Sequence, residues 1–404
     1  MMNKFCEHFV VGIIKWKLFT NWEGNMVRIL FLLHDLGQGG AEKVLVNLVN
    51  NMDRSKFDIT VITLFGGGVN EQFLLPHIRY QTVFKRMIPG NSKLMKLLSP
   101  QQLHRLFVKE QYDIEIAYLE GPSARVISGC CSPNTRLISW VHGEQRTRAA
   151  ASRSFRSERE ALDCYNRFNQ VVCVSDTVKR DFESIIRLDH ESIVLYNTVE
   201  SEQIRELSKD DAPEVIDDGC TKLVAVGTLK EVKGFDRLLR IMKRLKDEGK
   251  MVHLYLLGQG KLAQQFEQFS VENRLDDRVT MLGYQTNPYK YVEKCDLFVC
   301  SSYSEGFSTA ATEALIVGTP VVTTLVSGMK EMLGENNEYG LVTENSEEAL
   351  YQGIKQLLDH PDLLDHYRKQ AAIRGKMFST ENTVRAVEEM LMNLNVGLDD
   401  DSKR

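Results

Sequence analysis

Short apolar runs of β type alternate with helical patterns along nearly the whole chain. In the first half the continuous apolar run Val27–Leu33 precedes Ala41–Asn51, where apolar residues recur at helical spacing. The other strands expected in this half are Asp58–Leu64, Tyr112–Tyr118, Arg136–Val141, Val171–Val174 and Ile193–Tyr196. Strands that are apolar throughout are typical of a parallel sheet buried on both faces. The alternation therefore predicts an α/β fold with a doubly wound, Rossmann-like sheet.

The same alternation restarts after an acidic segment, Lys209–Gly219, which contains Pro and Gly and has no periodic pattern. We interpret this segment as the boundary between two similar domains. The strands expected beyond it are Lys222–Val226, Val252–Leu257, Arg278–Met281, Leu297–Cys300 and Pro320–Thr323. The expected organisation is an N-terminal extension over 1–25, a first domain over 26–208, a second over 220–375 and a last helix over 376–398. Ser379 is a suitable N-cap for that helix.

Residues 1–25 do not fit the alternation. Two interpretations stay open: a start codon placed too early, or a short amphipathic segment that lies on a membrane. No apolar run of the sequence approaches the roughly 18 residues of a transmembrane helix, and no small-residue cleavage site follows Phe9–Ile14. We therefore expect neither a membrane span nor a signal peptide.

Composition and charge exclude several classes of protein. Of the 404 residues, 43% are hydrophobic and 26% are charged, which argues against a disordered or fibrous chain. The net charge of −5 argues against a globally basic nucleic-acid-binding protein. The eight cysteines form no C-x-x-C pair and no zinc-like spacing, so we expect reduced thiols and no structural metal.

One stretch of the first half is strongly basic. Between Gln72 and Lys109 there is no acidic residue, and apolar residues such as Leu94, Leu97 and Leu106 alternate with bases. The bases are Arg79, Lys85, Arg86, Lys93, Lys96, Arg105 and Lys109. This composition suits a face that rests on anionic lipid. The other interpretation is a solvated loop and helix pair with its apolar side packed inward.

A glycine-rich loop follows the first predicted strand and contains Gly39 and Gly40. Glycines between a strand and a helix let the backbone approach a ligand and leave helix amides free. A dinucleotide-binding fingerprint needs a third glycine at the position of Glu42, so the NAD motif fails. On these residues alone, a plain strand-to-helix turn is an equally good interpretation.

The second domain repeats this arrangement with a lysine added. Gly227 follows a predicted strand, and Lys233 stands just before a helix that starts near Gly234. An ammonium group beside free helix amides suits a diphosphate, although a solvated surface lysine remains an alternative. Gly258 lies in another glycine turn between a strand and a helix.

Two carboxylates, Glu305 and Glu313, are eight residues apart near the next helix start. We expect Glu305 in a loop and Glu313 in the first turns of a helix capped by Ser308 or Thr309. Helix amides could then hold phosphate, while the carboxylates accept hydrogen bonds from sugar and ribose hydroxyls. The alternative is a capped helix with acidic residues near its N-terminus.

Together the early glycine loop, the G-x5-K-G loop and the E-x7-E element resemble the glycosyltransferase family 4 enzymes (glycosyl transferases group 1). The resemblance extends from Val27 to Asn395. It implies the GT-B fold, in which two Rossmann-like domains face each other across a cleft and the last helix crosses back to the first domain. It also implies a nucleotide-sugar donor held mainly by the second domain, a retaining transfer, and no required cofactor or metal.

The resemblance further implies roles for single residues. The catalytic residues would be Glu305 at the transferred sugar, Lys233 at the donor diphosphate and His142 near the sugar. Donor-binding residues would be Gly39, Gly40, Gly227, Lys230, Gly258, Phe307, Ser308, Thr309 and, at the ribose, Glu313. A lone histidine after a strand is usually structural, and only the resemblance favours a role for His142.

One departure from the family pattern concerns the diphosphate. Many members carry Arg directly after the first glycine of the G-x5-K-G loop, where this chain has Thr228. Either Lys230 supplies the second positive charge at the diphosphate, or only one cation binds the diphosphate.

The resulting hypothesis is a retaining hexosyl- or N-acetylhexosaminyl-type transfer from a UDP-sugar to a hydroxyl. Two routes stay open: a front-side reaction in which the departing phosphate takes the acceptor proton, and attack by Glu305 to form a glycosyl-enzyme. The basic face favours a lipid-linked saccharide acceptor, a role in cell-surface polysaccharide assembly, and a cytoplasmic protein or one peripheral to the cytoplasmic membrane face. Alternatives are a non-catalytic sugar-nucleotide sensor, a scaffold subunit, or a GT-B epimerase or phosphorylase.

Overall fold

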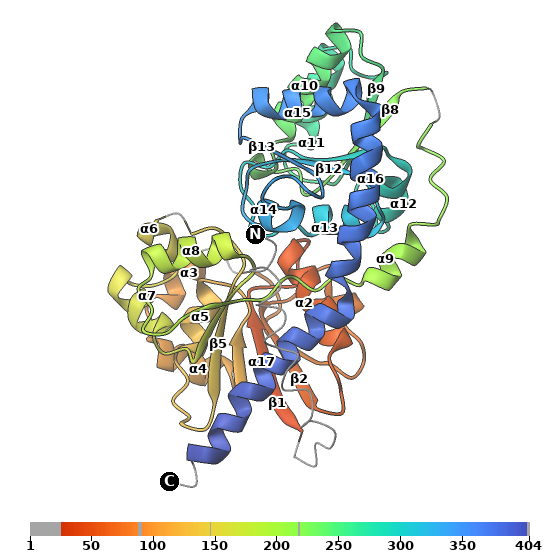
Figure 1. The fold of residues 1–404 in the computed structure, drawn as a ribbon. Coiled ribbons are helices and arrows are strands. Elements are labelled where there is room, and N and C mark those ends of the chain that lie inside the picture. The colour runs from red at the N-terminus through yellow and green to blue at the C-terminus, as the bar shows by residue number, and fades with distance from the viewer. Residues whose placement is uncertain (1–25, 88–90, 146, 217–218, 402–404) are drawn as a thin grey trace.

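The computed structural model describes residues 26–87, 91–145, 147–216 and 219–401, drawn in colour in Figure 1. Two α/β domains lie one above the other, each built on a parallel sheet with helices against it (Figure 1). The sequence-based expectations for residues 1–25 fall outside the described residues. Among the described residues, no helix is both long enough and apolar enough to cross a membrane.

The first domain is built on a seven-stranded sheet with the order β3-β2-β1-β4-β5-β6-β7. Its strands are β1 (Val27–Leu33), β2 (Phe57–Phe65), β3 (Arg79–Phe84), β4 (Ile114–Ala117), β5 (Arg136–Val141), β6 (Gln170–Cys173) and β7 (Ile193–Val194). All neighbouring strands are parallel, and the order reverses direction at β1 and β4. In such sheets, ligands bind at the carboxyl edge where the order reverses.

Helices connect these strands as the alternation predicts. They are α2 (Gly40–Asn51), the 3-10 turn η2 (Glu71–Phe73), α3 (Asn91–Met95), α4 (Pro100–Phe107), α5 (Pro122–Ile127), α6 (Arg148–Ala151), α7 (Glu158–Tyr165), α8 (Asp176–Ile185) and α9 (Ser201–Leu207). Helix α2 buries Val44, Leu45, Leu48 and Val49 against the sheet. The apolar periodicity of α2 thus decides which of its faces meets the strands.

The second domain repeats the plan with a six-stranded parallel sheet, ordered β10-β9-β8-β11-β12-β13. Its strands are β8 (Thr221–Val226), β9 (Val252–Leu257), β10 (Val279–Gly283), β11 (Leu297–Cys300), β12 (Val321–Thr324) and β13 (Leu341–Thr343). The helical elements are η3 (Glu231–Lys233), α10 (Phe235–Asp247), α11 (Ala263–Glu272), α12 (Tyr289–Lys294), α13 (Thr309–Ile316), α14 (Met329–Leu333), α15 (Glu347–Asp359), α16 (Pro361–Gly375) and η4 (Lys376–Phe378). The direction again reverses between β8 and β11.

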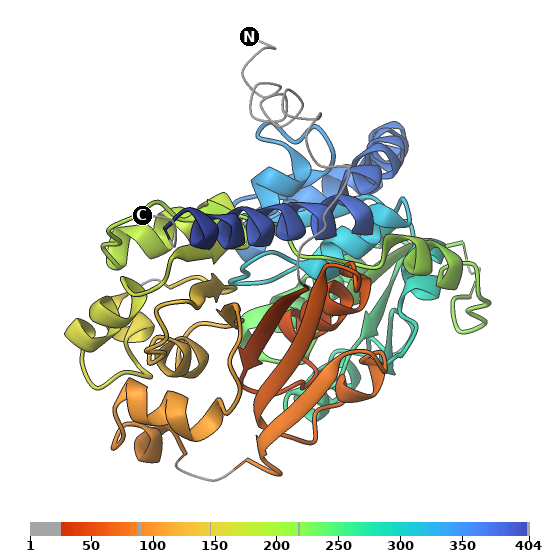
Figure 2. The same ribbon diagram turned by 90° about the horizontal axis from the view of Figure 1, so that it is seen from below.

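The last helix, α17 (Thr380–Asp401), returns from the second domain to the first. It follows α16 after the short turn η4 and runs along the side of the first domain (Figures 1 and 2). Ser379 accepts a hydrogen bond from the amide of Asn382 at 3.2 Å, which confirms the expected N-cap. Glu388 accepts a hydrogen bond from the amide of Asp53 at 2.6 Å, just beyond the end of α2.

The expected architecture is confirmed, but two strands were missed. Strand β3 lies in the basic stretch at one edge of its sheet, and its side chains are half-buried or exposed, so it has no continuous apolar signal. Strand β13 has only three residues and is also an edge strand. Edge strands bury less side-chain surface than central strands, so the apolar patterning that identifies central strands is weak in them.

Candidate functional site

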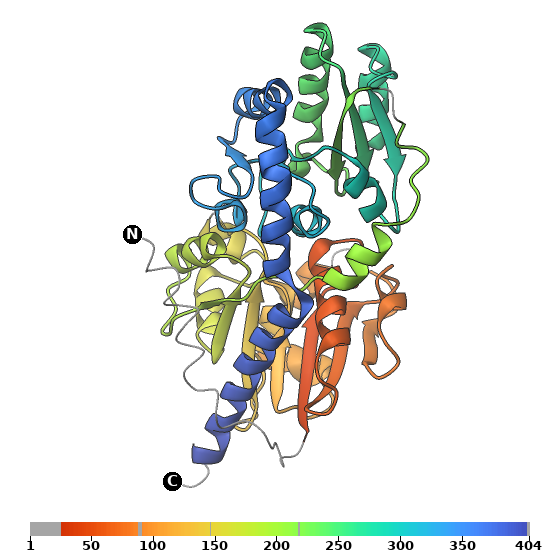
Figure 3. The ribbon, with the colours of Figure 1, turned by 45° about the vertical axis from the view of Figure 1, so that its right-hand side comes forward.

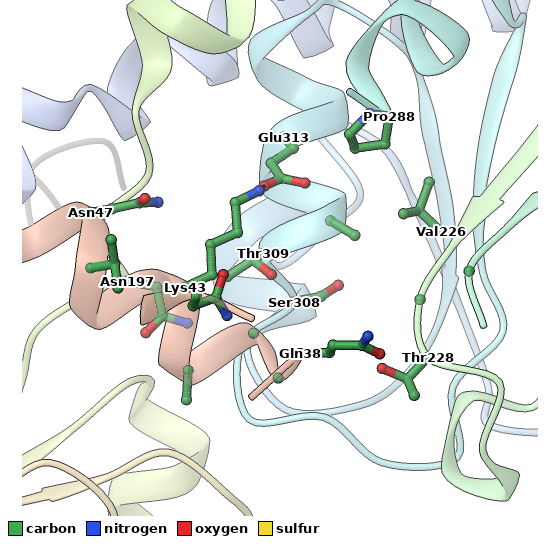
Figure 4. A pocket seen from close by; sticks show the side chains of 18 of the residues that line it. Gln38, Lys43, Asn47, Asn197, Val226, Thr228, Pro288, Ser308, Thr309 and Glu313 are labelled. Atoms are coloured by element: carbon green, nitrogen blue, oxygen red, sulfur yellow. Dashed lines mark hydrogen bonds and ion pairs between the residues drawn. The ribbon is translucent and has the colours of Figure 1, made fainter. Parts of the chain in front are cut away.

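A cavity of about 600 Å³ lies between the two domains, where the carboxyl ends of the strands of both sheets face each other. Figure 3 shows the two domains from another side, and Figure 4 shows the side chains of 18 of the residues that line the cavity. All the sequence-predicted site residues line this cavity except Lys230: Gly39, Gly40, His142, Gly227, Lys233, Gly258, Glu305, Phe307, Ser308, Thr309 and Glu313. Residues from distant parts of the chain therefore share one site.

The N-terminus of α2 borders the cavity from the first domain. Its N-cap, Gly39, provides no side-chain capping bond. A Cβ at Gly40 would lie 3.3 Å from Oγ1 of Thr309, so α2 and α13 begin close together across the cleft. A Cβ at Gly39 would clash with the carboxylate of Glu42, which folds back over this helix start. Two helix N-termini thus meet in the cavity, an arrangement that favours an anionic ligand.

Lys233 and Glu305 form an ion pair in the second-domain part of the cavity. The ammonium Nζ of Lys233 lies 2.6 Å from Oε1 of Glu305, and the hydroxyl of Ser302 donates to the same oxygen at 2.6 Å. Burial acts to lower the pKa of Lys233, but the carboxylate outweighs it and raises this pKa above its ordinary value. The lysine is therefore a permanent cation beside the start of α10.

A buried arginine holds the loop that carries Glu305. Arg237 on α10 is 1% exposed, and its guanidinium donates to the carbonyl oxygens of Ser301 at 2.7 Å and Ser302 at 2.5 Å. It also donates to Oδ1 of Asn345 at 2.9 Å. Because charge-assisted bonds of this kind are strong when shielded from water, the loop is fixed before any ligand enters.

Glu313 pairs with a residue that the sequence analysis did not single out. Lys43, in the first turn of α2, donates from Nζ to Oε1 of Glu313 at 2.8 Å and to the hydroxyl of Tyr289 at 2.6 Å. Figure 4 shows the Lys43 side chain reaching across the cleft to Glu313. Burial acts to lower the pKa of Lys43, but Glu313 and Tyr289 outweigh it and raise that pKa. Glu313 itself is 7% exposed.

The start of α13 is built as the E-x7-E element predicts. Ser308 is the N-cap and accepts a hydrogen bond from the amide of Ala311 at 3.4 Å. The side chain of Phe307 is buried and stacks near Tyr196, with ring centroids 5.2 Å apart. Its carbonyl oxygen accepts a hydrogen bond from Nδ2 of Asn197 at 3.3 Å. Asn197 of the first domain therefore fixes the entrance to α13.

Gly258 sits where no other residue fits. Its φ is +144°, and a Cβ there would lie 1.8 Å from the carbonyl oxygen of Gly227. The amide of Gly227 donates to the carbonyl of Leu257 at 3.0 Å. The two glycine turns of the second domain therefore pack backbone against backbone and form one wall of the cavity.

His142 directly follows β5 and lines the cavity as a neutral ring. Its ring lies 4.7 Å from that of Tyr118, and burial lowers its pKa to about 3. Nε2 of His142 is buried and has no hydrogen-bond partner among the described residues. Glu120 accepts a hydrogen bond from the amide of His142 at 3.0 Å and thereby anchors this loop. Because its pKa is so low, the ring carries no charge.

Lys230 is the predicted site residue that the fold does not bring into the cavity. Its side chain is exposed. Its positive charge acts to lower the pKa of two carboxylates of the first domain, Asp35 and Glu42. Thr228, in contrast, lines the cavity without a charge. The two residues belong to one tight turn, in which the amide of Lys230 donates to the carbonyl of Thr228.

Contacts across the cleft hold the two domains close together. Glu144, in the loop after β5, accepts a hydrogen bond from the hydroxyl of Ser304 at 2.7 Å and another from the hydroxyl of Ser327. A Cβ at Gly306 would lie 1.7 Å from the carbonyl oxygen of His142. The loop of Glu305 is thus pressed against the loop of His142, and a larger residue at 306 would separate them.

Three metal-ligand side chains meet elsewhere in the first domain. Suitable atoms of His104, Glu115 and Cys130 all lie within 4.8 Å of one another. Nε2 of His104 and Oε2 of Glu115 are 2.7 Å apart. Two ligands bound tetrahedrally at about 2.0–2.1 Å would be separated by roughly 3.3 Å. This geometry is that of a hydrogen-bonded ion pair, and it lies outside the cavity.

Comparisons with known proteins match both halves of the chain. The family model "Glycosyltransferase Family 4" matches residues 38–203, and the model "Glycosyl transferases group 1" matches residues 208–374. Among curated relatives, the N-acetylgalactosamine-N,N'-diacetylbacillosaminyl-diphospho-undecaprenol 4-alpha-N-acetylgalactosaminyltransferase of Campylobacter jejuni is 33% identical over 201 residues, 49% of this chain and 53% of that protein. The match thus spans about half of that relative. The lipopolysaccharide core biosynthesis glycosyltransferase LpsD of Rhizobium meliloti is 23% identical over 90% of this chain and 96% of its own.

Solved structures share the fold at low sequence identity. Anabaena Alr3699/HepE in complex with UDP is 20% identical, with a TM-score of 0.70 over 91% of this chain and 100% of that one. Sucrose-phosphate synthase of Thermosynechococcus elongatus is 18% identical, with a TM-score of 0.74 over 92% and 100%. These likenesses confirm the GT-B fold. With both family models matched in order along the chain, the protein belongs to the group 1 glycosyltransferases of family 4.

Proposed function

We propose that the protein is a retaining glycosyltransferase that moves a sugar from a UDP-sugar to a hydroxyl of a lipid-linked saccharide. The observation that carries this proposal is the arrangement in the cavity, where the start of α13 lies beside the Lys233–Glu305 pair. A helix N-terminus and an ammonium suit a diphosphate, and a carboxylate suits sugar hydroxyls. A nucleotide-sugar combines these chemical groups in one molecule.

In the proposed reaction the charge develops on the leaving diphosphate. Lys233 and the first amides of α13 stabilise that charge most in the transition state, which makes their contribution catalytic. The neutral ring of His142 exchanges a hydrogen bond with a hydroxyl of the transferred sugar. In the front-side route the acceptor oxygen bonds to the anomeric carbon as the bond to UDP breaks, and the acceptor proton passes to the departing phosphate oxygen. In the two-step route Glu305 bonds to the anomeric carbon as UDP leaves, and the acceptor oxygen then displaces Glu305 and gives its proton to the UDP phosphate.

Relatives support the choice of donor and acceptor. Anabaena HepE has been crystallised with UDP, with UDP and glucose, and with UDP-glucose. The Campylobacter jejuni relative is named for an undecaprenol diphosphate-linked saccharide, and the Rhizobium meliloti relative for lipopolysaccharide core synthesis. We therefore assign the protein a role in cell-surface polysaccharide assembly, with a hexosyl or N-acetylhexosaminyl group as the transferred sugar.

The basic stretch provides a surface that suits binding to the membrane in which a lipid-linked acceptor is held. Around α3 and α4 the side chains of Leu94, Leu97 and Leu106 are more than half exposed, and the neighbouring residues Lys93 and Arg105 are exposed as well. Soluble proteins rarely expose several large apolar side chains close together, so exposed leucines among bases are typical of a surface that binds a membrane. We propose that this face, defined by α3 and α4, rests on the anionic cytoplasmic side of a membrane.

The activity is tested by incubating the protein with a panel of UDP-sugars and a polyprenyl-diphosphate sugar, and measuring UDP release. We expect release from the wild-type protein, a loss of at least 100-fold in Glu305→Ala, and little change in the control Glu347→Ala, an exposed carboxylate of α15. UDP-sugar binding with no UDP release by the wild-type protein would instead support a sensor. A covalent adduct trapped on Glu305 would exclude the front-side route.

The membrane face is tested by flotation with liposomes of anionic or neutral lipid. Each basic residue near an anionic surface contributes about 1 kcal/mol, so Lys93→Ala with Lys96→Ala should weaken binding by roughly 30-fold. The matched control removes two exposed lysines of the second domain, Lys330 and Lys369. Equal binding of the wild-type protein to neutral and anionic vesicles would contradict the proposal.

A further inference from the structure

Both cations in the cavity are already neutralised by a carboxylate. Of the described residues that line it, Lys43 and Lys233 carry positive charge, and each is bonded to one glutamate. The Lys43–Glu313 distance is 2.8 Å and the Lys233–Glu305 distance is 2.6 Å. The Lys43 pair joins the first domain to the second, whereas the Lys233 pair lies within the second.

A nucleotide-sugar contains the complement of both pairs. Its ribose and its sugar present hydroxyl groups, which donate hydrogen bonds to carboxylates. Its diphosphate has two negative charges, which attract ammonium groups. When hydroxyls occupy Glu305 and Glu313, the two lysines lose part of their neutralisation. A cation in a shielded site without an anionic partner is unfavourable, so both lysines are then best satisfied by the diphosphate.

From this complementarity we infer that Lys43 is the second cation of the donor diphosphate site, supplied across the cleft by the first domain. The inference rests on the proposed function, because it presupposes a nucleotide-sugar in this cavity. In the empty protein, Glu313 holds the ammonium of Lys43 next to the site. When the donor binds, ribose hydroxyls take the place of the ammonium on Glu313, and the ammonium turns to the diphosphate.

The position of Lys43 on α2 makes this movement short. Its amide donates to the carbonyl of Gly39 at 3.3 Å, so Lys43 lies one turn from the start of the helix. That start faces Thr309, the first residue of α13, across the cleft. Long side chains on a helix lean toward its N-terminus. In the structure the ammonium of Lys43 is bonded to Glu313, four residues after Thr309, so it lies about one helical turn from the meeting point of the two helix starts, where a diphosphate would bind.

The inference also accounts for the uncharged residue after Gly227. Thr228 lines the cavity without a charge, and Lys230 is exposed outside the cavity. Lys233 alone would leave one of the two diphosphate charges without a cation. The side chain of Lys43 is 40% exposed and lines the cavity, so a ligand can reach it without rearrangement of the backbone.

The test compares UDP with uridine, which has the same ribose but no phosphate, by isothermal titration calorimetry. In Lys43→Met we expect UDP to bind at least tenfold more weakly, while uridine binds within threefold of wild type or more tightly. Retained uridine binding also shows that the variant is folded. Lys43→Arg should keep UDP binding within about fivefold, and Lys369→Met, which changes an exposed lysine of α16 outside the cavity, should leave the binding of both ligands unchanged.

Two results would overturn the inference. Unchanged UDP binding in Lys43→Met would show that Lys43 does not meet the diphosphate. Tighter UDP binding in Lys43→Met would show that Lys43 only competes with the ribose for Glu313. A wild-type protein that binds neither ligand would instead overturn the proposed function, and with it this inference.

Discussion

Replacing Lys233 with Met tests the chemistry of the cavity most directly, because Met has a similar length and no charge. The ammonium of Lys233 lies 2.6 Å from Glu305, and its side chain is 26% exposed. A charge-assisted hydrogen bond contributes about 1.5–3 kcal/mol, which corresponds to a factor of roughly 10–150 in kcat/KM. Removal also leaves Glu305, 11% exposed, without its cation and opposed to the diphosphate. Both effects act in the same direction.

The assay is UDP release at subsaturating UDP-sugar, which reports kcat/KM, with UDP affinity measured separately by calorimetry. We expect Lys233→Met to lose at least tenfold in both quantities. Lys369→Met is the matched control, since this exposed lysine of α16 lies outside the cavity, and it should remain within threefold of wild type. If Lys233→Met stays within threefold, or if Lys369→Met loses as much, the assignment of the diphosphate site is wrong.

Three further predictions concern stability and pH. Gly258→Ala places a Cβ 1.8 Å from a carbonyl oxygen at a φ of +144°, so it should lower the unfolding free energy, measured by calorimetry, by at least about 2 kcal/mol. The control Gly249→Ala, at a φ of +73° with open space around the new Cβ, should lower it by about 1 kcal/mol. Equal losses in the two variants would contradict the packing described for Gly258. Burial lowers the pKa of His142 to about 3, so His142 should contribute no limb to the pH profile of kcat/KM between pH 5 and 9. A limb near pH 6.5 that disappears in His142→Asn would refute a neutral ring. Burial acts to lower the pKa of His104, but its buried thiol and carboxylate neighbours raise it to about 9. The pKa of His104 is thus higher in the folded state than its value of about 6.5 in the unfolded state. The charged ring therefore contributes about 3 kcal/mol to the unfolding free energy below pH 6.5, and this contribution should be lost as the pH rises to 9. Urea unfolding of His104→Gln should lack this decline, and the same decline in the variant would contradict the assignment.

Much of the site was predictable from short-range patterns. The G-x5-K-G loop, the E-x7-E element and the early glycine loop each follow a predicted strand, and the carboxyl ends of parallel strands meet at one edge of a sheet. The structure accordingly places Lys233, Glu305 and the N-cap Ser308 at the cavity. Each of these features depends on residues within about ten positions of one another in the chain.

Lys43 and Tyr289 were missed for a physical reason. Lys43 and Glu313 are 270 residues apart in the sequence, and their contact exists only because two separate sheets face each other. Tyr289, the other partner of Lys43, is the first residue of α12 in the second domain. One signal was present: Lys43 lies three residues after Gly40, on the first turn of a helix whose N-terminus was expected at a ligand.

The sequence by itself determined the repeating strand–helix units, the glycine turns and the helix caps, because hydrogen bonding and apolar periodicity act over a few residues. The tertiary structure decided which charges meet. It placed Lys230 outside the cavity and Lys43 inside it, although both are lysines beside glycine-rich turns. The reason is that the distance between two side chains on different domains depends on how the domains pack, and no local pattern records that packing.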